Sequence, residues 1–485
     1  MIMGKLTTIF KDTAIYGLSS IAGRFLNYLL VPLYTAKLPA ASGGYGVITN
    51  IYAYVALVLV LLTFGMETTY FRFTNKTHTD SPTVYATTLI TVGSLSLAFA
   101  VLVLLLLSPV SRLMGYADHP EYVGVMAVTV AIDAFLCIPF AHLRQQKKAV
   151  KFAALKLLNI VAGILLNLIY FYLIGGRDVG YAFYINLACT AMTAVCLLTE
   201  YTGFRWRLDT RLLRSMLSYS WPILVLGIAG ILNQTADKML FPYIYKESDM
   251  LQQLGIYGAC SKIAMIMAMI TQAFRFAYEP IVFAGVKDKD QHELYARAMK
   301  YFIVFTLLAF LLVVGYMDVL KRIVVPNPDY WVGLRVVPIV MAAEIMMGIY
   351  FNLSFWYKLI DRTVWGALFS GIGCAALIAV NVVFVPRYGF MACAWAGLVG
   401  YGVAMLSSYV AGQHYYPIRY PLRQIAVYVL LALAIFLVMN RCAHWPVAAS
   451  LGVNTLLILC FVAYIVWRED ELKKIGHILR RKEHR

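Results

Sequence analysis

Residues 81–111 read SPTVYATTLITVGSLSLAFAVLVLLLLSPVS, a run of 31 residues without a charged side chain. Two further uncharged runs cover residues 388–418 and 442–467. An α-helix needs about 20 predominantly apolar residues to cross the hydrocarbon core of a bilayer. Each of the three runs is therefore long enough to form a membrane-spanning helix.

The whole chain shares this composition. Of its 485 residues, 61% are hydrophobic and 13% are charged, and the mean hydropathy is +0.74. Soluble chains carry roughly 25% charged residues. Fourteen spans of about 20 residues would use about 280 positions, which leaves short loops and tails and no room for a soluble domain. This composition excludes an ordinary soluble enzyme and a disordered or collagen-like chain.

Charged residues and clusters of Pro and Gly divide the sequence into fourteen apolar segments. We therefore predict an all-α polytopic membrane protein with about 14 transmembrane helices. The predicted helices cover 12–36, 45–71, 84–110, 121–142, 153–174, 179–199, 213–241, 254–276, 296–319, 331–357, 363–386, 389–412, 422–440 and 445–467.

The positions of the basic residues predict the orientation. With the N-terminus inside, 29 of the 41 Lys and Arg residues fall in inner segments, 8 in outer loops and 4 within spans. Cytoplasmic loops of membrane proteins carry an excess of Lys and Arg. Because the number of spans is even, we expect both termini in the cytoplasm.

The chain carries a formal net charge of +17, but we do not expect it to bind nucleic acid. The basic residues lie in short gaps between apolar runs, where they determine topology. The sequence contains no CxxC pair, no HExxH motif and neither GxGxxG nor GxxxxGK[ST]. We therefore expect no enzymatic activity, no metal, no other cofactor and no direct use of ATP.

A weak internal repeat relates residues 16–72 to residues 219–275. Each copy has a Tyr-Gly pair between two helices and ends in an aromatic-Arg-Phe triplet, with Arg72 in the first copy and Arg275 in the second. Six spans separate the copies, so two parallel-oriented six-helix halves are expected. The predicted domains are 1–205 and 206–415 for these halves, 416–467 for accessory helices 13–14 and 468–485 for a basic cytoplasmic tail.

Several motifs spread over this core resemble one protein family. They include Arg24-Phe-Leu-Asn-Tyr-Leu-Leu-Val-Pro-Leu-Tyr34, Gly65-Met-Glu-Thr-Thr-Tyr-Phe-Arg72, Asn233-Gln-Thr-Ala-Asp-Lys238 and Phe351-Asn-Leu-Ser-Phe-Trp-Tyr-Lys358. The chain resembles the polysaccharide transporters, which are O-antigen or capsule repeat-unit flippases of the multidrug/oligosaccharidyl-lipid/polysaccharide flippase superfamily.

This resemblance implies a flippase in the bacterial cytoplasmic (inner) membrane. Its cargo would be an undecaprenyl-diphosphate-linked oligosaccharide used to make O-antigen, capsule or exopolysaccharide. The partners would be that lipid-linked oligosaccharide, membrane lipids and other polysaccharide-assembly proteins. The alternative is an ion-coupled multidrug exporter of the same superfamily. An exporter of cationic drugs should have acidic groups in its cavity with little opposing charge, whereas here basic groups accompany the acids.

Basic residues within spans are candidates for binding a diphosphate, because a charge near the bilayer centre costs at least ~2.5 kcal/mol. Arg24 lies about 18 Å into the first predicted helix, and Asn27 follows on the same face. Arg24 would contact the substrate or neutralise a buried carboxylate. Lys238 and Lys262 would face the same cavity, although Lys262 also lies near enough to a helix end to snorkel.

Acidic residues within spans are candidates for coupling transport to H⁺ or Na⁺. Asp133 and Glu344 each lie about thirteen residues into a predicted helix, and either one would carry a coupling ion or neutralise Arg24. Asp237 would contribute to coupling or form a structural ion pair with Lys238. Arg275 and Glu279, four residues apart, are predicted to form a gate or a structural pair.

Overall fold

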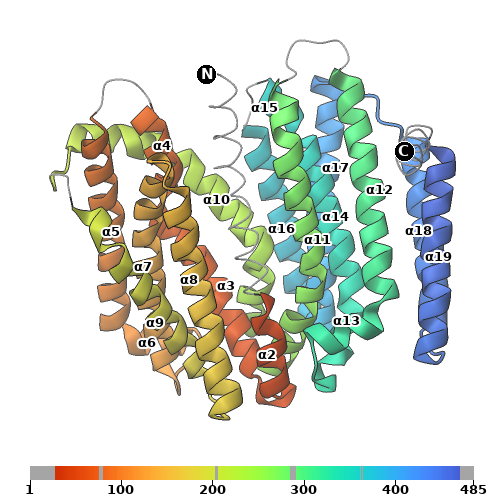
Figure 1. The fold of residues 1–485 in the computed structure, drawn as a ribbon, viewed down its shortest axis with the longest axis horizontal. Helices are drawn as coiled ribbons and strands as arrows, with labels where there is room; N and C mark the ends of the chain where they lie inside the picture. Colours follow the sequence, from red (N-terminus) through yellow and green to blue (C-terminus); the bar gives the residue numbers. More distant parts are fainter. Residues whose placement is uncertain are drawn as a thin grey trace, which may run out of the picture. The chain divides into compact units, whose positions relative to one another are not determined.

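The computed structural model describes residues 28–75, 80–202, 206–284, 291–360, 362 and 364–469. Over these ranges the chain is helical and contains no strand (Figure 1). Twelve of the described helical segments are long and apolar enough to cross a membrane, and Gly180–Cys196 is a shorter apolar helix. The predicted all-α membrane fold is confirmed, and the count of 14 is approximate. Only Leu30–Lys37 represents the first predicted helix, since most of 12–36 lies outside the described residues.

Close packing divides the chain into two compact units. The first unit comprises Met1–Ala259, Asn327–Tyr330 and Cys374–Gly397, and the second comprises Cys260–Pro326, Trp331–Gly373 and Leu398–Arg485. The division into two repeated six-helix halves with accessory helices stays a prediction.

The first unit is built mainly from α2 to α10. Their bounds are Leu30–Lys37 (α2), Gly44–Thr63 (α3), Met66–Asn75 (α4), Ser81–Leu105 (α5), Leu107–Leu113 (α6), Pro120–Gln145 (α7), Ala149–Leu168 (α8), Gly180–Cys196 (α9) and Thr210–Ile244 (α10). A π-helix, Ile169–Leu173, extends α8, and a 3-10 turn, Leu198–Tyr201, follows α9. The first ten residues of α11, Met250–Ala284, also belong to this unit.

The second unit contains the rest of α11 and most of the C-terminal helices. Their bounds are Gln291–Gly315 (α12), Met317–Val324 (α13), Val336–Leu353 (α14), Phe355–Leu359 (α15), Val364–Tyr388 (α16), Phe390–Tyr415 (α17), Leu422–Cys442 (α18) and Val447–Arg468 (α19). Parts of α16 and α17 are assigned to the first unit.

Hydrogen bonds fix the last two helices to α12 at both ends. Glu469, just after α19, accepts hydrogen bonds from Lys300 Nζ at 2.5 Å and from Tyr428 Oη at 2.6 Å. Burial raises the pKa of the Glu469 carboxyl, but the hydrogen bonds from Lys300 and Tyr428 lower it further, so the pKa lies below its ordinary value. Near the other end, Asn454 Nδ2 donates to the carbonyl oxygen of Gly315 at 2.9 Å.

The predicted helix 45–71 is wrong in one respect, because it is broken into α3 and α4. Phe64 and Gly65 both have positive φ, 51° and 67°. A Cβ at Gly65 would lie 2.9 Å from Cγ2 of Ile223 on α10, so the close approach of another helix requires glycine here. Residues 45–71 contain no proline, so the sequence of this segment alone did not predict the break.

The Tyr-Gly pairs of the two predicted repeat copies lie against each other where α3 and α11 begin. A Cβ at Gly46 would overlap the backbone carbonyl group of Leu251, and a Cβ at Gly255 would lie 2.9 Å from the backbone nitrogen of Gly46. A Cβ at Gly258 would overlap the side chain of Thr49. The two helices therefore meet backbone to backbone, which only small residues permit.

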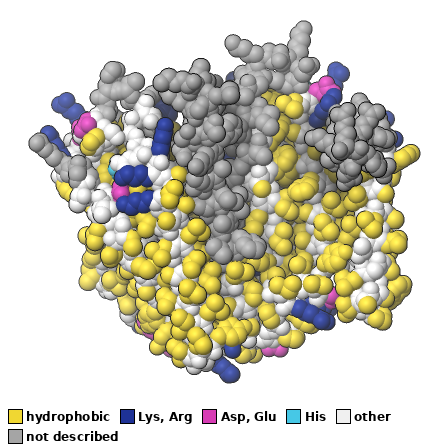
Figure 2. All heavy atoms as spheres, in the orientation of Figure 1, with side chains coloured by type: hydrophobic (Ala, Val, Ile, Leu, Met, Phe, Trp, Pro, Cys, Tyr) yellow, Lys and Arg dark blue, Asp and Glu magenta, His cyan; other side chains and the backbone are white. Residues whose placement is uncertain are grey.

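Most of the coloured surface in Figure 2 is hydrophobic, and Lys, Arg, Asp and Glu side chains appear on it in a few separate groups. Large apolar residues in the spans are well exposed, as at Leu105, Val410 and Leu430. In water such exposure would be unfavourable, whereas lipid tails solvate it. The protein is therefore a multi-pass integral membrane protein.

Candidate functional site

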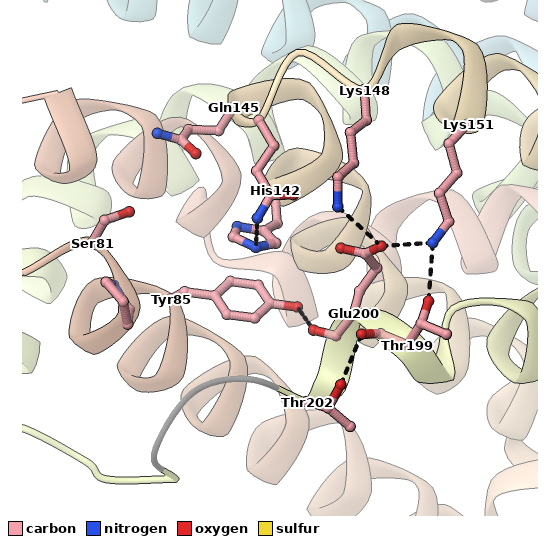
Figure 3. Close-up of a pocket in the computed structure, with 11 residues that line it drawn as sticks. Ser81, Tyr85, His142, Gln145, Lys148, Lys151, Thr199, Glu200 and Thr202 are labelled. Atoms are coloured by element: carbon pink, nitrogen blue, oxygen red, sulfur yellow. Dashed lines mark hydrogen bonds and ion pairs between the residues drawn. The ribbon is translucent and has the colours of Figure 1, made fainter.

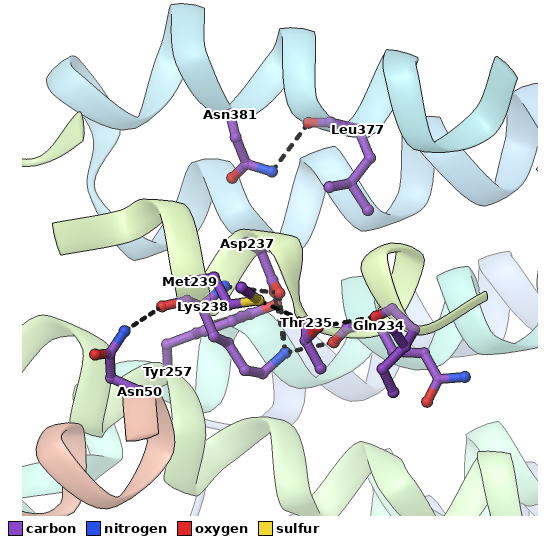
Figure 4. A network of polar contacts seen from close by, with 10 residues as sticks. Asn50, Gln234, Thr235, Asp237, Lys238, Met239, Tyr257, Leu377 and Asn381 are labelled. Carbon is purple, nitrogen blue, oxygen red and sulfur yellow. Dashed lines mark hydrogen bonds and ion pairs between the residues drawn. The ribbon is translucent and has the colours of Figure 1, made fainter. Parts of the chain in front are cut away.

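An ion pair near the C-terminal end of α10 is the centre of a buried polar network. Lys238 Nζ lies 3.1 Å from both carboxylate oxygens of Asp237 and also donates to the carbonyl oxygen of Gln234 at 3.1 Å (Figure 4). Tyr257 on α11 donates its hydroxyl hydrogen to Asp237 Oδ2 at 2.6 Å. The Asp237 side chain is 8% exposed and that of Lys238 is 22% exposed. The carboxylate therefore has several donor contacts around it, and the pair is neutral as a whole.

The network continues from α10 to α3. Asn50, which is fully buried on α3, donates to the carbonyl oxygen of Lys238 at 2.8 Å and accepts from the Tyr116 hydroxyl at 2.9 Å. Burial raises the pKa of Tyr116, so its phenol stays a hydrogen-bond donor. These contacts hold the backbone of α10 in place at the residue that carries the ammonium group.

This arrangement limits what Lys238 can do in the observed conformation. Its charge is compensated by Asp237, and its ammonium lies 5.2 Å from the centre of the Tyr257 ring. A diphosphate would have to replace the Asp237 carboxylate as the partner of Lys238. Sequence spacing placed the two residues side by side, and both the structural pair and a substrate role stay open predictions.

Asp133 lies in a second polar cluster, which joins α7, α8 and α9. Thr190 Oγ1 on α9 donates to Asp133 Oδ1 at 3.1 Å, and the charge of Lys156 on α8 acts on the same carboxylate. Lys156 Nζ lies 4.0 Å from the centre of the Phe140 ring on α7. Asp133 is thus a partly buried acid with a cation nearby, which suits either coupling or charge balance.

The other predicted site residues are placed as follows. Lys262 on α11 and Glu344 on α14 belong to the second unit, and each is partly buried. The exposed Arg275 has its guanidinium 5.0 Å from the centre of the Phe351 ring. Glu279 lies on α11, but its side chain is outside the described part of the chain, as are Arg24 and Asn27. Their roles stay predictions.

Sequence reasoning missed Tyr257, Asn50 and Lys156. A charged residue inside an apolar run stands out, whereas a tyrosine or an asparagine does not, and the bond from Asn50 to Lys238 joins positions 188 apart. Lys156 lies within α8, inside the predicted helix 153–174. The residues around it in the sequence include no acid, so no local pattern indicated that it accompanies Asp133.

Comparisons with known proteins give the family from a family model and the fold from solved structures. The family model described as "Polysaccharide biosynthesis protein" matches residues 42–324. The curated proteins contain no significant match in sequence. Among solved structures, the lipid II flippase MurJ in an inward closed conformation is 12% identical, with a TM-score of 0.75 over 93% of this chain and 99% of that one.

Two multidrug transporters are also similar in structure. An inward-facing MATE family transporter of the MOP superfamily is 14% identical, with a TM-score of 0.65 over 81% of this chain and 94% of that one. The MATE multidrug transporter DinF-BH is 16% identical, with a TM-score of 0.61 over 84% and 96%. These TM-scores, at low sequence identity, establish a shared fold. Because the family model covers more than half of its residues, the chain belongs to the polysaccharide biosynthesis protein family.

Proposed function

We propose that the protein is a flippase that moves an undecaprenyl-diphosphate-linked oligosaccharide across the bacterial cytoplasmic membrane. The observation that carries the proposal is the family match over residues 42–324, in a chain whose fold is similar to that of a lipid II flippase. A flippase of this type would supply repeat units for O-antigen, capsule or exopolysaccharide. Both termini would lie in the cytoplasm, as the distribution of Lys and Arg predicts.

In this proposal the basic residues of the spans bind the diphosphate. Arg24 and Asn27 would form the midplane contact, and Lys238 and Lys262 would add positive charge. Support comes from the ion pair of Lys238, whose ammonium already binds an anionic oxygen acceptor, the Asp237 carboxylate, that a phosphate would have to replace. A phosphate oxygen and a carboxylate oxygen are equivalent acceptors for this ammonium.

Transport would be driven by an ion gradient through Asp133, Glu344 and Asp237. Protonation of a buried carboxylate or entry of Na⁺ beside it changes the local charge by one unit. Support comes from the hydrogen-bond donors on the partly buried Asp133 and the buried Asp237, since such contacts change when a carboxylate gains a proton. Arg275 and Glu279 would form a gate or structural pair at the inner end of α11.

Export of organic cations is the competing function, since two structural neighbours are multidrug transporters. Ligand stabilisation separates the two. The purified protein is heated with undecaprenyl diphosphate carrying a sugar repeat unit, with undecaprenyl monophosphate, or with a cationic rhodamine dye. We expect the diphosphate-linked sugar to raise Tm by several degrees, with a smaller effect of the monophosphate and none of the dye. Stabilisation by the dye alone would contradict the proposal.

A further inference from the structure

A pocket of about 720 Å³, lined mainly by residues with polar groups, opens at one end of the first unit and shares no residue with the network around Asp237. It lies where α5 begins, α7 ends, α8 begins and the chain leaves α9 (Figure 3). These are ends of apolar spans, so the pocket lies at the depth where a bilayer has its headgroups. Its lining residues are Ser81, Pro82, Tyr85, His142, Gln145, Gln146, Lys148, Lys151, Thr199, Glu200 and Thr202.

The two lysines in this pocket differ in how closely they contact its one lining carboxylate. Glu200 is the carboxylate of the lining, its side chain is 6% exposed, and it accepts from Lys151 Nζ at 2.6 Å. Lys151 also donates to Thr199 Oγ1 at 2.9 Å. Lys148 Nζ lies 3.6 Å from the same carboxylate, beyond a normal hydrogen bond, and its side chain is 47% exposed. Lys151 thus neutralises Glu200, and Lys148 leaves the pocket with a net positive charge.

Uncharged donors line the pocket across from Lys148 (Figure 3). The side chains of Ser81 and Gln145 make no hydrogen bond within the described ranges, and both line the pocket. Of the acids near these segments in the sequence, Glu67 forms an ion pair with Arg144 at 2.6 Å, whereas Asp80 accepts from the uncharged Thr83 hydroxyl at 3.1 Å, keeps its charge and does not line the pocket. An anion bound by Lys148 would therefore leave the ion pair between Lys151 and Glu200 in place, and Ser81 and Gln145 offer further donors across the same pocket.

We propose that this pocket binds the phosphate headgroup of an anionic glycerophospholipid, with Lys148 as its principal contact. Basic pockets between transmembrane helices on the cytoplasmic side are suited to such headgroups. The three chain segments that form this one, at residues 81–85, 142–151 and 199–202, adjoin loops that the distribution of Lys and Arg assigns to the inner side. The site would tie the first unit to anionic lipid whatever cargo the protein carries.

The test measures lipid binding to the full chain in detergent by native mass spectrometry. Phosphatidylglycerol, phosphatidylcholine and inorganic phosphate are titrated separately. We expect wild type to retain phosphatidylglycerol in preference to phosphatidylcholine, and Lys148→Gln to weaken phosphatidylglycerol binding about tenfold or more, because a charge-assisted hydrogen bond is lost. Lys147→Gln is the matched control: it removes the same charge from the adjacent residue, which does not line the pocket, and we expect less than about a threefold change.

A second variant tests whether weaker binding by Lys148→Gln comes from lost charge or from local unfolding of the pocket. Glu200→Gln removes the negative charge from the pocket, and we expect it to strengthen phosphatidylglycerol binding about twofold or more. If Lys148→Gln and Lys147→Gln weaken binding equally, the attraction is diffuse and the proposed site is wrong. Binding of inorganic phosphate without phosphatidylglycerol would also overturn the proposal, as would unchanged or weaker binding by a folded Glu200→Gln variant.

Discussion

Substitutions at Asp237 and Lys238 can distinguish a structural ion pair from a substrate-binding site. The carboxylate accepts from Tyr257 at 2.6 Å and from Lys238 at 3.1 Å, and both side chains are largely buried. Removing one member leaves the other charge buried without its partner, which costs about 3–5 kcal/mol. Removing both members avoids this cost.

We predict that Asp237→Asn and Lys238→Gln each lower the free energy of unfolding by about 3 kcal/mol, and that the double variant loses less than either. Thermal unfolding in detergent measures this. If Lys238 also binds the diphosphate, the double variant folds well but transports poorly. Full transport by the double variant would show that the pair is structural only.

Glu200 gives a pH-dependent contribution to stability. Burial raises the pKa of its carboxyl, but the hydrogen bond from Lys151 and the charges of Lys151 and Lys148 lower it more, so its pKa lies below the ordinary 4.5. Because the native pKa is the lower one, its stabilisation is present above about pH 4.5 and disappears as the pH falls through the native value.

We therefore predict that the Tm difference between wild type and Glu200→Gln is largest near about pH 7 and shrinks below about pH 4.5. The control is Glu293→Gln, at an ion pair whose carboxylate side chain is 64% exposed, and its effect on Tm at neutral pH should be small. A Glu200→Gln difference that grows on acidification would contradict the assigned charge interactions.

At the residue scale, charged residues within spans could be identified from the sequence, but their hydrogen-bond partners could not. Asp133 and Asp237 were identifiable because charged residues are costly in apolar helices. Thr190, Tyr257 and Asn50 were not identifiable, because uncharged polar residues are common in spans and their partners come from other helices. Only the packing of α3, α7, α9 and α11 brings these groups to the acids or to the backbone beside them.

At the element scale, the contact between α3 and α11 depends on glycine. We predict that Gly46→Ala lowers the free energy of unfolding by about 3 kcal/mol, because its methyl group would meet the backbone of Leu251. The control is Gly230→Ala on α10, where a Cβ meets nothing within 4 Å. There the better helix propensity of alanine should stabilise the protein by up to about 1 kcal/mol. Equal effects of the two variants would argue against the close helix contact.

The length of the apolar runs predicted where helices exist, but it did not predict where they break or end. The uncharged run 81–111 does form a span, Ser81–Leu105, but it then turns at Leu106 into the separate helix α6. The break at Phe64–Gly65 depends on Ile223 of another helix, which no local pattern can show. The predicted helix 179–199 is shorter in the structure, Gly180–Cys196, and a 3-10 turn at Leu198–Tyr201 follows it. This turn carries Glu200, which lines the pocket.

At the scale of the whole molecule, ion coupling requires acids within the spans that bind and release H⁺ or Na⁺ during each transport cycle. We predict that transport in vesicles follows an imposed gradient of H⁺ or Na⁺ and does not require ATP. Moving one charge through the field is worth about 2.3 kcal/mol per 100 mV, which biases two states roughly fifty-fold. Asp133→Asn and Glu344→Gln, tested separately, should reduce this dependence in at least one case. Unchanged dependence in both variants would exclude these acids as couplers.

Direct translocation of the cargo is the most decisive measurement. The full chain is reconstituted into vesicles whose inner leaflet contains undecaprenyl diphosphate linked to a fluorescent sugar, and an impermeant reagent quenches the cargo that reaches the outer leaflet. We predict gradient-dependent quenching with the wild type, a large loss with Arg24→Ala at normal insertion, and partial activity with Arg24→Lys, since a cation binds phosphate chiefly through its charge. Efflux of a cationic rhodamine dye with no movement of the lipid-linked sugar would contradict the assignment as a flippase.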